Sequence, residues 1–333
     1  MVRGGRDNRL TYSQNLSCGA AAGLVSRTLT SPLDVVKIRM QVGTKETLQQ
    51  GSLRSFGNIY TAHGVRAFWK GNLIGCLRLS PFTAVQFLAF SRCKALLADD
   101  TGRLTAARAM MAGALGGMAA TIVTYPTDMV KTRLIVQPTA PTRKRYRGII
   151  HAFKLILKEE GLLAFYKGML TSLLGSIPFS AGTFAAYELL DMAWTKPRYM
   201  LTPVENFING CLAGAIAQTI SYPFDTIRKK LQAQSRVMKD GGGVDIKFQG
   251  MVSGFKKTVA QYGWKGLWRG NIPNLCKIAP YAGFMFMTYE TCKKVFLYEN
   301  GFSISPYDDT PISGVDQSLK PDELRMWKER HSS

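Results

Sequence analysis

The chain has 333 residues, of which 46% are hydrophobic and 11% aromatic, and it carries a formal net charge of +21. This apolar content excludes a disordered chain, because it is enough to bury a large core. Six cysteines in a chain of this length exclude a scaffold built on disulfides.

The mean hydropathy of −0.03 conceals long stretches without charge, because the charged residues are gathered in blocks. Two windows are interrupted by a single base, 71–91 by Arg78 and 270–289 by Lys277, and four windows hold no charged residue: 11–26, 109–127, 168–187 and 206–224. These lengths approach the roughly 20 residues with which a helix crosses the hydrocarbon core. They indicate six membrane helices, with six core helices of a soluble bundle as the less favoured alternative.

In chain order, the windows and their flanks predict long helices over 12–41, 72–97, 105–136, 169–193, 203–235 and 271–297. A shorter amphipathic stretch follows each odd helix and is typical of a surface helix, at 51–62, 148–160 and 249–262. Most basic residues lie on this side of the predicted helices. Two end segments remain: residues 1–10, which are basic, and residues 301–333, which are polar and which we expect to form an exposed tail.

One order of motifs occurs three times. Pro-x-Asp-x-x-basic-x-basic occurs in SPLDVVKIR, YPTDMVKTR and YPFDTIRKK, and an aromatic-basic-Gly motif follows in HGVRAFWKG, EGLLAFYKG and YGWKGLWRG. A period of about 97 residues is too long for a solenoid unit and fits two spanning helices with a connecting segment. We therefore divide the chain into three repeats, 11–100, 101–198 and 199–300.

Each first motif places an aspartate three residues before a base, on the same helix face: Asp34 with Lys37, Asp128 with Lys131, and Asp225 with Arg228. The preceding proline can bend the helix, so that the three faces converge and each aspartate pairs with a base of another repeat. Such a ring suits a gate. Two glutamines, four residues after the base, are placed to brace a pair, whereas the second repeat has Ile135 there: Gln41 and Gln232. Three ordinary solvated helix ends are the alternative, which the threefold recurrence disfavours.

These motifs resemble the signature of the mitochondrial carrier family over about residues 11–300. The resemblance implies an all-α membrane protein whose six transmembrane helices form a pseudo-threefold barrel in the mitochondrial inner membrane, with short amphipathic helices on the matrix side. It also implies alternating access to a single central site, with the aspartate ring as the matrix gate. Cardiolipin is expected at the helix starts of the aromatic-basic-Gly motifs, at Gly71, Gly168 and Gly270.

The opposite, cytoplasmic gate departs from the family pattern of aromatic-acid-x-x-basic. Ser91 stands in place of the acid of the first repeat, and Asp191 in place of the base of the second. By the family's pairing one ion pair remains, and the residues that match the pattern are Lys94, Glu188, Glu290 and Lys293. Because a pair in a wet cavity contributes about 0.2–1 kcal/mol, the two missing pairs predict a resting preference for the state closed on the matrix side.

The bases at membrane depth predict an anionic substrate, because an unpaired charge there is expensive and usually functional. They are Arg27, Arg78 and Lys277. In family terms the last two occupy contact positions, and Gly175 with Ser176 occupies the third. A glycine there is typical of members that carry nucleotides or phosphorylated cofactors, although Ser176 departs from the usual aliphatic residue. Gln86 and Gln218 are polar candidates for the cavity wall, or for helix–helix hydrogen bonds.

We expect no enzyme, metal or cofactor, because the cysteines and histidines have no ligand spacing and no Ser/His/Asp set is visible. The expected partners of this monomer are an anionic metabolite, cardiolipin and membrane lipid. Nucleic acid is not expected, since the bases follow a membrane repeat rather than one contiguous face. The second hypothesis is a carrier-fold protein that does not transport and serves as a regulatory or interaction platform, for which the incomplete gate leaves room.

Overall fold

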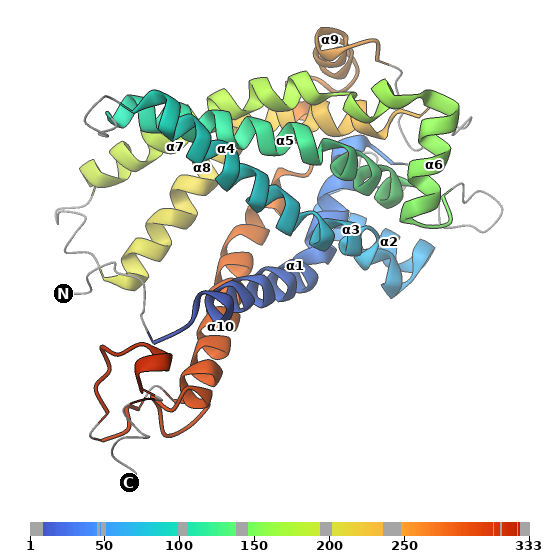
Figure 1. The fold of residues 1–333 in the computed structure, drawn as a ribbon. Helices are drawn as coiled ribbons and strands as arrows, with labels where there is room; N and C mark the ends of the chain where they lie inside the picture. Colours follow the sequence, from blue (N-terminus) through green and yellow to red (C-terminus); the bar gives the residue numbers. More distant parts are fainter. Residues whose placement is uncertain are drawn as a thin grey trace. The chain divides into compact units, whose positions relative to one another are not determined.

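A computed structural model describes residues 9–44, 47, 51–98, 105–137, 146–193, 202–235, 248–308, 310–313, 315–324 and 326. These residues are mainly helical, and the β pairing among them is one isolated bridge between Ser303 and Pro311. The long helices follow the predicted order (Figure 1): α1 Tyr12–Val42, α3 Asn72–Leu77 with α4 Leu79–Leu97, α5 Ala106–Val136, α7 Met169–Ala193, α8 Pro203–Ala233 and α10 Asn271–Glu299.

The predicted helix over 72–97 is divided at Arg78 into α3 and α4. Pro81 lies three residues further on and has no N–H with which to bond the preceding turn. The backbone at Arg78 nevertheless stays right-handed helical, and its N–H donates to the carbonyl of Ile74 at 3.1 Å. The chain therefore continues in one direction through the division.

Each pair of long helices is joined by a surface helix and a 3-10 turn: α2 Ser52–His63 with η1 Val65–Trp69, α6 Ile149–Glu160 with η3 Leu162–Tyr166, and α9 Met251–Tyr262 with η6 Trp264–Trp268. The alternation of apolar and polar residues decides which side of these helices packs. In α6, Ala152 and Ile156 are buried against the protein, while Ile150 on the other side is exposed.

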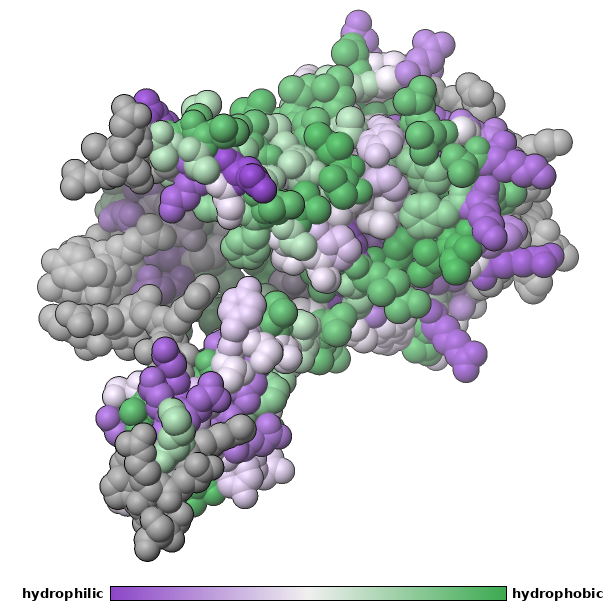
Figure 2. Space-filling model, in the orientation of Figure 1, coloured by the Kyte–Doolittle hydropathy of each residue, from purple (hydrophilic) through white to green (hydrophobic). Residues whose placement is uncertain are grey.

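Within the described residues, three helical stretches are long and apolar enough to cross a membrane, by length and composition: Val65–Leu97, Arg108–Val136 and Leu162–Met192. At most 28% of their most apolar windows is buried inside the protein, so most of these residues are left for a lipid environment. Figure 2 shows hydrophobic residues gathered over α4 and α5, with hydrophilic ones near α2 and α6. The other predicted membrane helices, α1, α8 and α10, contain more polar side chains.

The chain divides into two compact units, one of residues 30–279 and one of residues 1–29 with 280–333. In the larger unit α4 packs on α5, α7 packs on α8, and α5 contacts α8. One hydrophobic cluster joins the ends of the three helices that carry the Pro-x-Asp motifs; its members are Val35, Ile38, Val42, Ile135, Val136 and Ala233. The convergence predicted for these helix ends is therefore present.

The smaller unit contains the first part of α1, the last part of α10 and the segment that follows it. Many described positions of the predicted tail are exposed, but the segment is not exposed throughout, because Phe302 and Leu324 are buried with Leu10 and Leu297. The apolar residues are spaced among Asp, Ser and Gly, so the average composition hides them. Residues 327–333 of the predicted tail lie outside the described residues.

Candidate ion-pair gate and substrate site

The three aspartates of the Pro-x-Asp motifs each form an ion pair with the base of another repeat. Lys37 Nζ lies 2.8 Å from Asp225 Oδ2. Lys131 Nζ lies 3.3 Å from Asp34 Oδ2, and Arg228 Nη2 lies 2.6 Å from Asp128 Oδ2. The side chains are 7–18% exposed, so water competes little for these contacts. The ring joins all three repeats within the larger unit.

Two of the pairs are braced by the glutamines that the spacing singled out. Gln41 donates Nε2 to Asp225 Oδ2 at 3.1 Å, and Gln232 donates Nε2 to Asp128 Oδ2 at 3.0 Å. The pair of Asp34 with Lys131 belongs to the repeat with Ile135, which offers no such donor.

Arg78 and Lys277 are not unpaired, which corrects the premise on which the sequence argument rested. Arg78 donates Nη1 to Asp128 Oδ1 at 3.0 Å, and Lys277 donates Nζ to Asp34 Oδ1 at 2.7 Å. Each reaches the carboxylate oxygen that the ring pair leaves free, Arg78 from the junction of α3 and α4 and Lys277 from α10. These two bases are thus linked directly to the ring.

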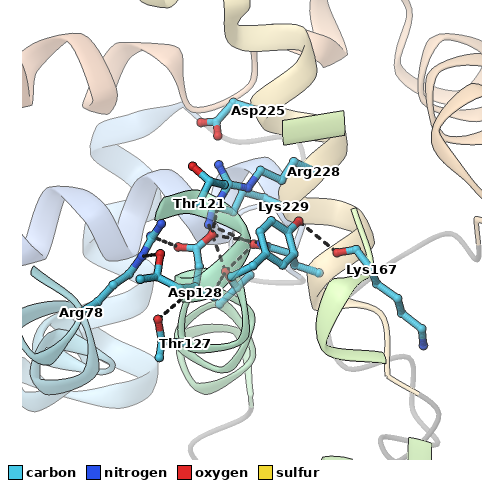
Figure 3. A network of polar contacts seen from close by, with 12 residues as sticks. Arg78, Thr121, Thr127, Asp128, Lys167, Asp225, Arg228 and Lys229 are labelled. Atoms are coloured by element: carbon cyan, nitrogen blue, oxygen red, sulfur yellow. Dashed lines mark hydrogen bonds and ion pairs between the residues drawn. The ribbon is translucent and has the colours of Figure 1, made fainter. Parts of the chain in front are cut away.

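Lys229 is a member of the network that the sequence argument missed. Its Nζ lies 3.0 Å from Asp128 Oδ2, and it also donates to Thr132 Oγ1 and to Gln232 Oε1. Figure 3 shows Arg78 reaching Asp128 from one side and Lys229 and Arg228 from the other. The available signal was a third adjacent base in the last motif, where the other repeats have Ile38 and Thr132.

The second base of the middle motif anchors the surface helix α6. Arg133 is fully buried and binds Glu160 through two hydrogen bonds, of 2.7 and 2.9 Å. Lys167 and Ser235 also donate to Glu160, at 2.9 and 2.7 Å. Burial raises the pKa of Glu160, but the hydrogen bonds and charge of Arg133 and its other donors outweigh this and lower it to about 2.

Replacing Glu160 with Gln is expected to cost about 3 kcal/mol of folding stability at neutral pH, because Arg133 would keep its burial and lose its charge partner. The folded-state pKa is depressed, so the carboxylate stabilises the protein above its unfolded pKa and less as the pH falls toward 2. The difference in free energy of unfolding between the two proteins should therefore shrink below about pH 4.5. Denaturant unfolding at several pH values measures it, and a difference independent of pH would contradict the pairing.

The glycines expected to bind cardiolipin lie where one repeat closely approaches the next. Gly270 has a positive φ of 84°, and a Cβ on it would lie 3.0 Å from the carbonyl oxygen of Lys37. Gly168, with φ 82°, would bring a Cβ within 3.2 Å of the carbonyl of Arg228. Both conditions favour glycine. These contacts explain the residue type without a lipid, so cardiolipin binding at Gly71, Gly168 and Gly270 stays a prediction.

A pocket of about 80 Å³ lies beside the third carboxylate of the ring. Asp225, Arg228 and Gly175 line it together with Phe224, and hydroxyl and amide groups complete its wall: Thr171, Ser172, Gln218 and Ser221. Gly175 occupies the position equivalent to Arg78 and Lys277, so no base projects from it toward Asp225. A Cβ at Gly175 would lie 2.8 Å from Cβ of Phe224, which favours glycine here.

The remaining predicted site residues have a less direct place in this network. Ser176 donates to the carbonyl of Leu173 in its own helix and does not line the pocket, and Gln86 is half-buried on α4. Arg27 belongs to the smaller unit. Three of the expected cytoplasmic gate residues, Lys94, Glu188 and Glu290, are exposed, and Lys293 is half-buried. Their role stays a prediction.

The comparisons with known proteins agree with the three repeats. The family model described as mitochondrial carrier protein matches residues 8–101, 102–197 and 199–300. The chain belongs to the mitochondrial carrier family, and its helices have that family's all-α, three-repeat membrane fold.

Two relatives cover almost the whole chain. Solute carrier family 25 member 43 of Mus musculus is 45% identical over 97% of this chain and 94% of its own length. The protein of the same name from Danio rerio is 46% identical over 97% of this chain and 93% of its own length. The mitochondrial adenine nucleotide transporter ADNT1 of Arabidopsis thaliana is 35% identical over 85% of this chain and 86% of its own length.

Proposed function

We propose that this protein is a transporter of the mitochondrial inner membrane that moves an anionic, nucleotide-like metabolite by alternating access through one central site. The observation that carries the proposal is the link of Arg78 and Lys277, at the family's contact positions, to the carboxylates of the ion-pair ring. A ligand that binds these bases must also weaken their contacts with the ring carboxylates, so ligand binding and opening of the gate become coupled.

The charge of the site supports an anion. Three carboxylates bind six cationic side chains: Lys37, Arg78, Lys131, Arg228, Lys229 and Lys277. This leaves an excess of three positive charges in a mostly buried place, which is costly unless anions approach it. Phosphate groups fit, because arginine and lysine bind them with charge-assisted hydrogen bonds.

The pocket beside Gly175 supports a second, uncharged part of the same ligand. Gln218 and the hydroxyl groups of Thr171, Ser172 and Ser221 can exchange hydrogen bonds with a ring system, and Phe224 offers an aromatic surface. Two bases that can bind phosphate, with a polar pocket that also contains an aromatic side chain, suit a nucleotide. The names of relatives such as the adenine nucleotide transporter of Arabidopsis thaliana point to the same class.

In this function the ring acts as the matrix gate, and the residues Lys94, Glu188, Glu290 and Lys293 act at the cytoplasmic gate. With fewer ion pairs available there, the protein rests closed on the matrix side. It works as a monomer, with cardiolipin at the helix starts near Gly71, Gly168 and Gly270. No catalytic step is needed, because the substrate crosses unchanged.

Uptake of labelled ADP or ATP into liposomes loaded with unlabelled nucleotide tests the proposal. Lys37→Asp is expected to abolish uptake, because Asp225 then faces another carboxylate. Adding Asp225→Lys restores the pair in reverse and should recover part of the rate, since Gln41 can bind either charge. Failure of folded wild-type protein to transport any nucleotide, phosphorylated cofactor or keto acid would favour the non-transporting platform.

A further inference from the structure

The smaller unit contains a hydrophobic core built from three separate parts of the chain. Leu10 precedes α1, Leu297 lies at the end of α10, and Phe302 and Leu324 come from the segment after it. All four are at most 6% exposed. Phe296, Val315 and Leu319 pack around them. A surface tail would not bury this much apolar area, so the segment has a defined place against both helices.

Hydrogen bonds connect the same three parts. Asn300, just after α10, donates Nδ2 to the carbonyl of Arg9 at 3.0 Å and exchanges side-chain hydrogen bonds with Gln14 of α1, at 2.9 and 3.0 Å. Arg9 donates Nη1 to Gln317 Oε1 at 3.2 Å, and Gln317 donates to the carbonyl of Phe302. Asn300 is buried, and its amide bonds to both of these N-terminal residues.

We propose that residues 300–308, 310–313 and 315–324 form a clasp that ties the start of α1 to the end of α10. Since α1 opens the first repeat and α10 closes the third, the clasp joins these two repeats at the N-terminal end of α1, opposite the end of that helix that carries Asp34. In the proposed function this is the cytoplasmic end. There the clasp keeps the first and third repeats in contact while the other contacts between repeats open.

The first repeat lacks one residue of the predicted cytoplasmic gate. The family's pairing would place a carboxylate at position 91 as the partner of the third repeat's base, and this chain has Ser91. An ion pair in a wet cavity contributes little, whereas burial of several large apolar side chains contributes more and does not weaken with salt. The clasp therefore replaces an electrostatic contact between the first and third repeats by an apolar one.

The matches to the member 43 relatives extend into the segment that forms the clasp. The member 43 proteins match 97% of this chain, which must take in most of the residues after 300. The mitochondrial adenyl nucleotide antiporter SLC25A24 of Homo sapiens is 34% identical over 84% of this chain. A match of this second length is accounted for by the three repeats without the clasp.

The distance between spin labels on α1 and α10 tests the clasp directly. Labels are placed at Tyr12 and Tyr298, which are 75% and 48% exposed, in full-length protein whose six cysteines are replaced by alanine, reconstituted in cardiolipin-containing liposomes. We expect one narrow distance population. Phe302→Asp should add a population of longer distances, because it places a charge in the core of the clasp. Tyr307→Asp is the matched control, since Tyr307 belongs to the same segment and is 85% exposed.

Two results would overturn the clasp. The first is a broad distribution of spin-label distances in the unmutated protein. The second is an unchanged distance distribution in Phe302→Asp, when cleavage by chymotrypsin shows that the mutated segment no longer packs on the helices. If Phe302→Asp fails to fold, Leu324→Asp at the far end of the segment provides the same test without disturbing the end of α10. Stabilisation by ADP is measured on each variant as well. It reports on the larger unit, so the clasp and the proposed transport can fail independently.

Discussion

Replacing Asp128 with alanine is expected to destabilise the folded protein by about 3–5 kcal/mol, the range for removing one partner of a buried ion pair. Asp128 is 5% exposed and binds Arg78, Arg228 and Lys229, so its loss leaves three cations close together without their carboxylate. Thermal unfolding of the purified protein in the presence of cardiolipin measures the change.

Asp225→Ala is the matched control, because among the described residues Asp225 forms an ion pair with Lys37 alone, and the amide of Gln41 donates to it. It should cost clearly less than Asp128→Ala. Adding Lys229→Thr to Asp128→Ala should recover part of the loss, since threonine is the residue of the middle repeat at this position and removes one of the repelling charges. Equal losses of stability for both aspartate variants, with no recovery in the double variant, would contradict the larger role of Asp128 in the ring.

The second large effect is on binding. Arg78→Gln is expected to lower the affinity for ADP at least about tenfold, because a hydrogen bond between charged groups contributes about 1.5–3 kcal/mol. The same change should disturb the unliganded protein little, since Asp128 keeps Arg228, Lys229 and Gln232 as donors. Isothermal titration of the purified protein with ADP gives the affinity.

Two comparisons make this binding prediction specific. Lys154→Gln, on the exposed side of α6, removes the same charge from the chain and should leave the affinity unchanged. Lys277→Gln should lower both affinity and stability, because Asp34 would keep Lys131 as its remaining cation. An Arg78→Gln protein that binds ADP as tightly as the wild type would show that Arg78 serves the ring alone.

Much of the fold could be predicted because its determinants are local and repeated. The uncharged windows place the long helices, and the Asp-x-x-base spacing places an aspartate and a base on one face of the first helix of each repeat. The division of the predicted helix over 72–97 into α3 and α4, and the buried core of the clasp, could not be predicted in the same way. The division occurs near Pro81, whereas α7 and α10 continue through their own prolines, Pro178 and Pro280, without interruption. The core of the clasp depends on a few apolar side chains in a polar segment.

The site shows where spacing stops being informative. It predicts which residues share a face, but not how far a side chain reaches, so Arg78 and Lys277 were expected to be unpaired although each reaches an aspartate. Lys229 was missed because the threefold comparison concentrates on shared positions. It is a base in one repeat alone and therefore falls outside the common motif.

In the proposed function an anionic ligand binds the bases held by the ring. The most direct measurement compares the thermal unfolding of folded wild-type protein with adenosine, AMP, ADP and ATP, because a ligand that binds the folded state raises its apparent stability. We expect a shift that grows with the number of phosphate groups, is absent for adenosine and is reduced in Arg78→Gln. An equal shift with adenosine, or no shift with any of these anions or with phosphorylated cofactors, would contradict it.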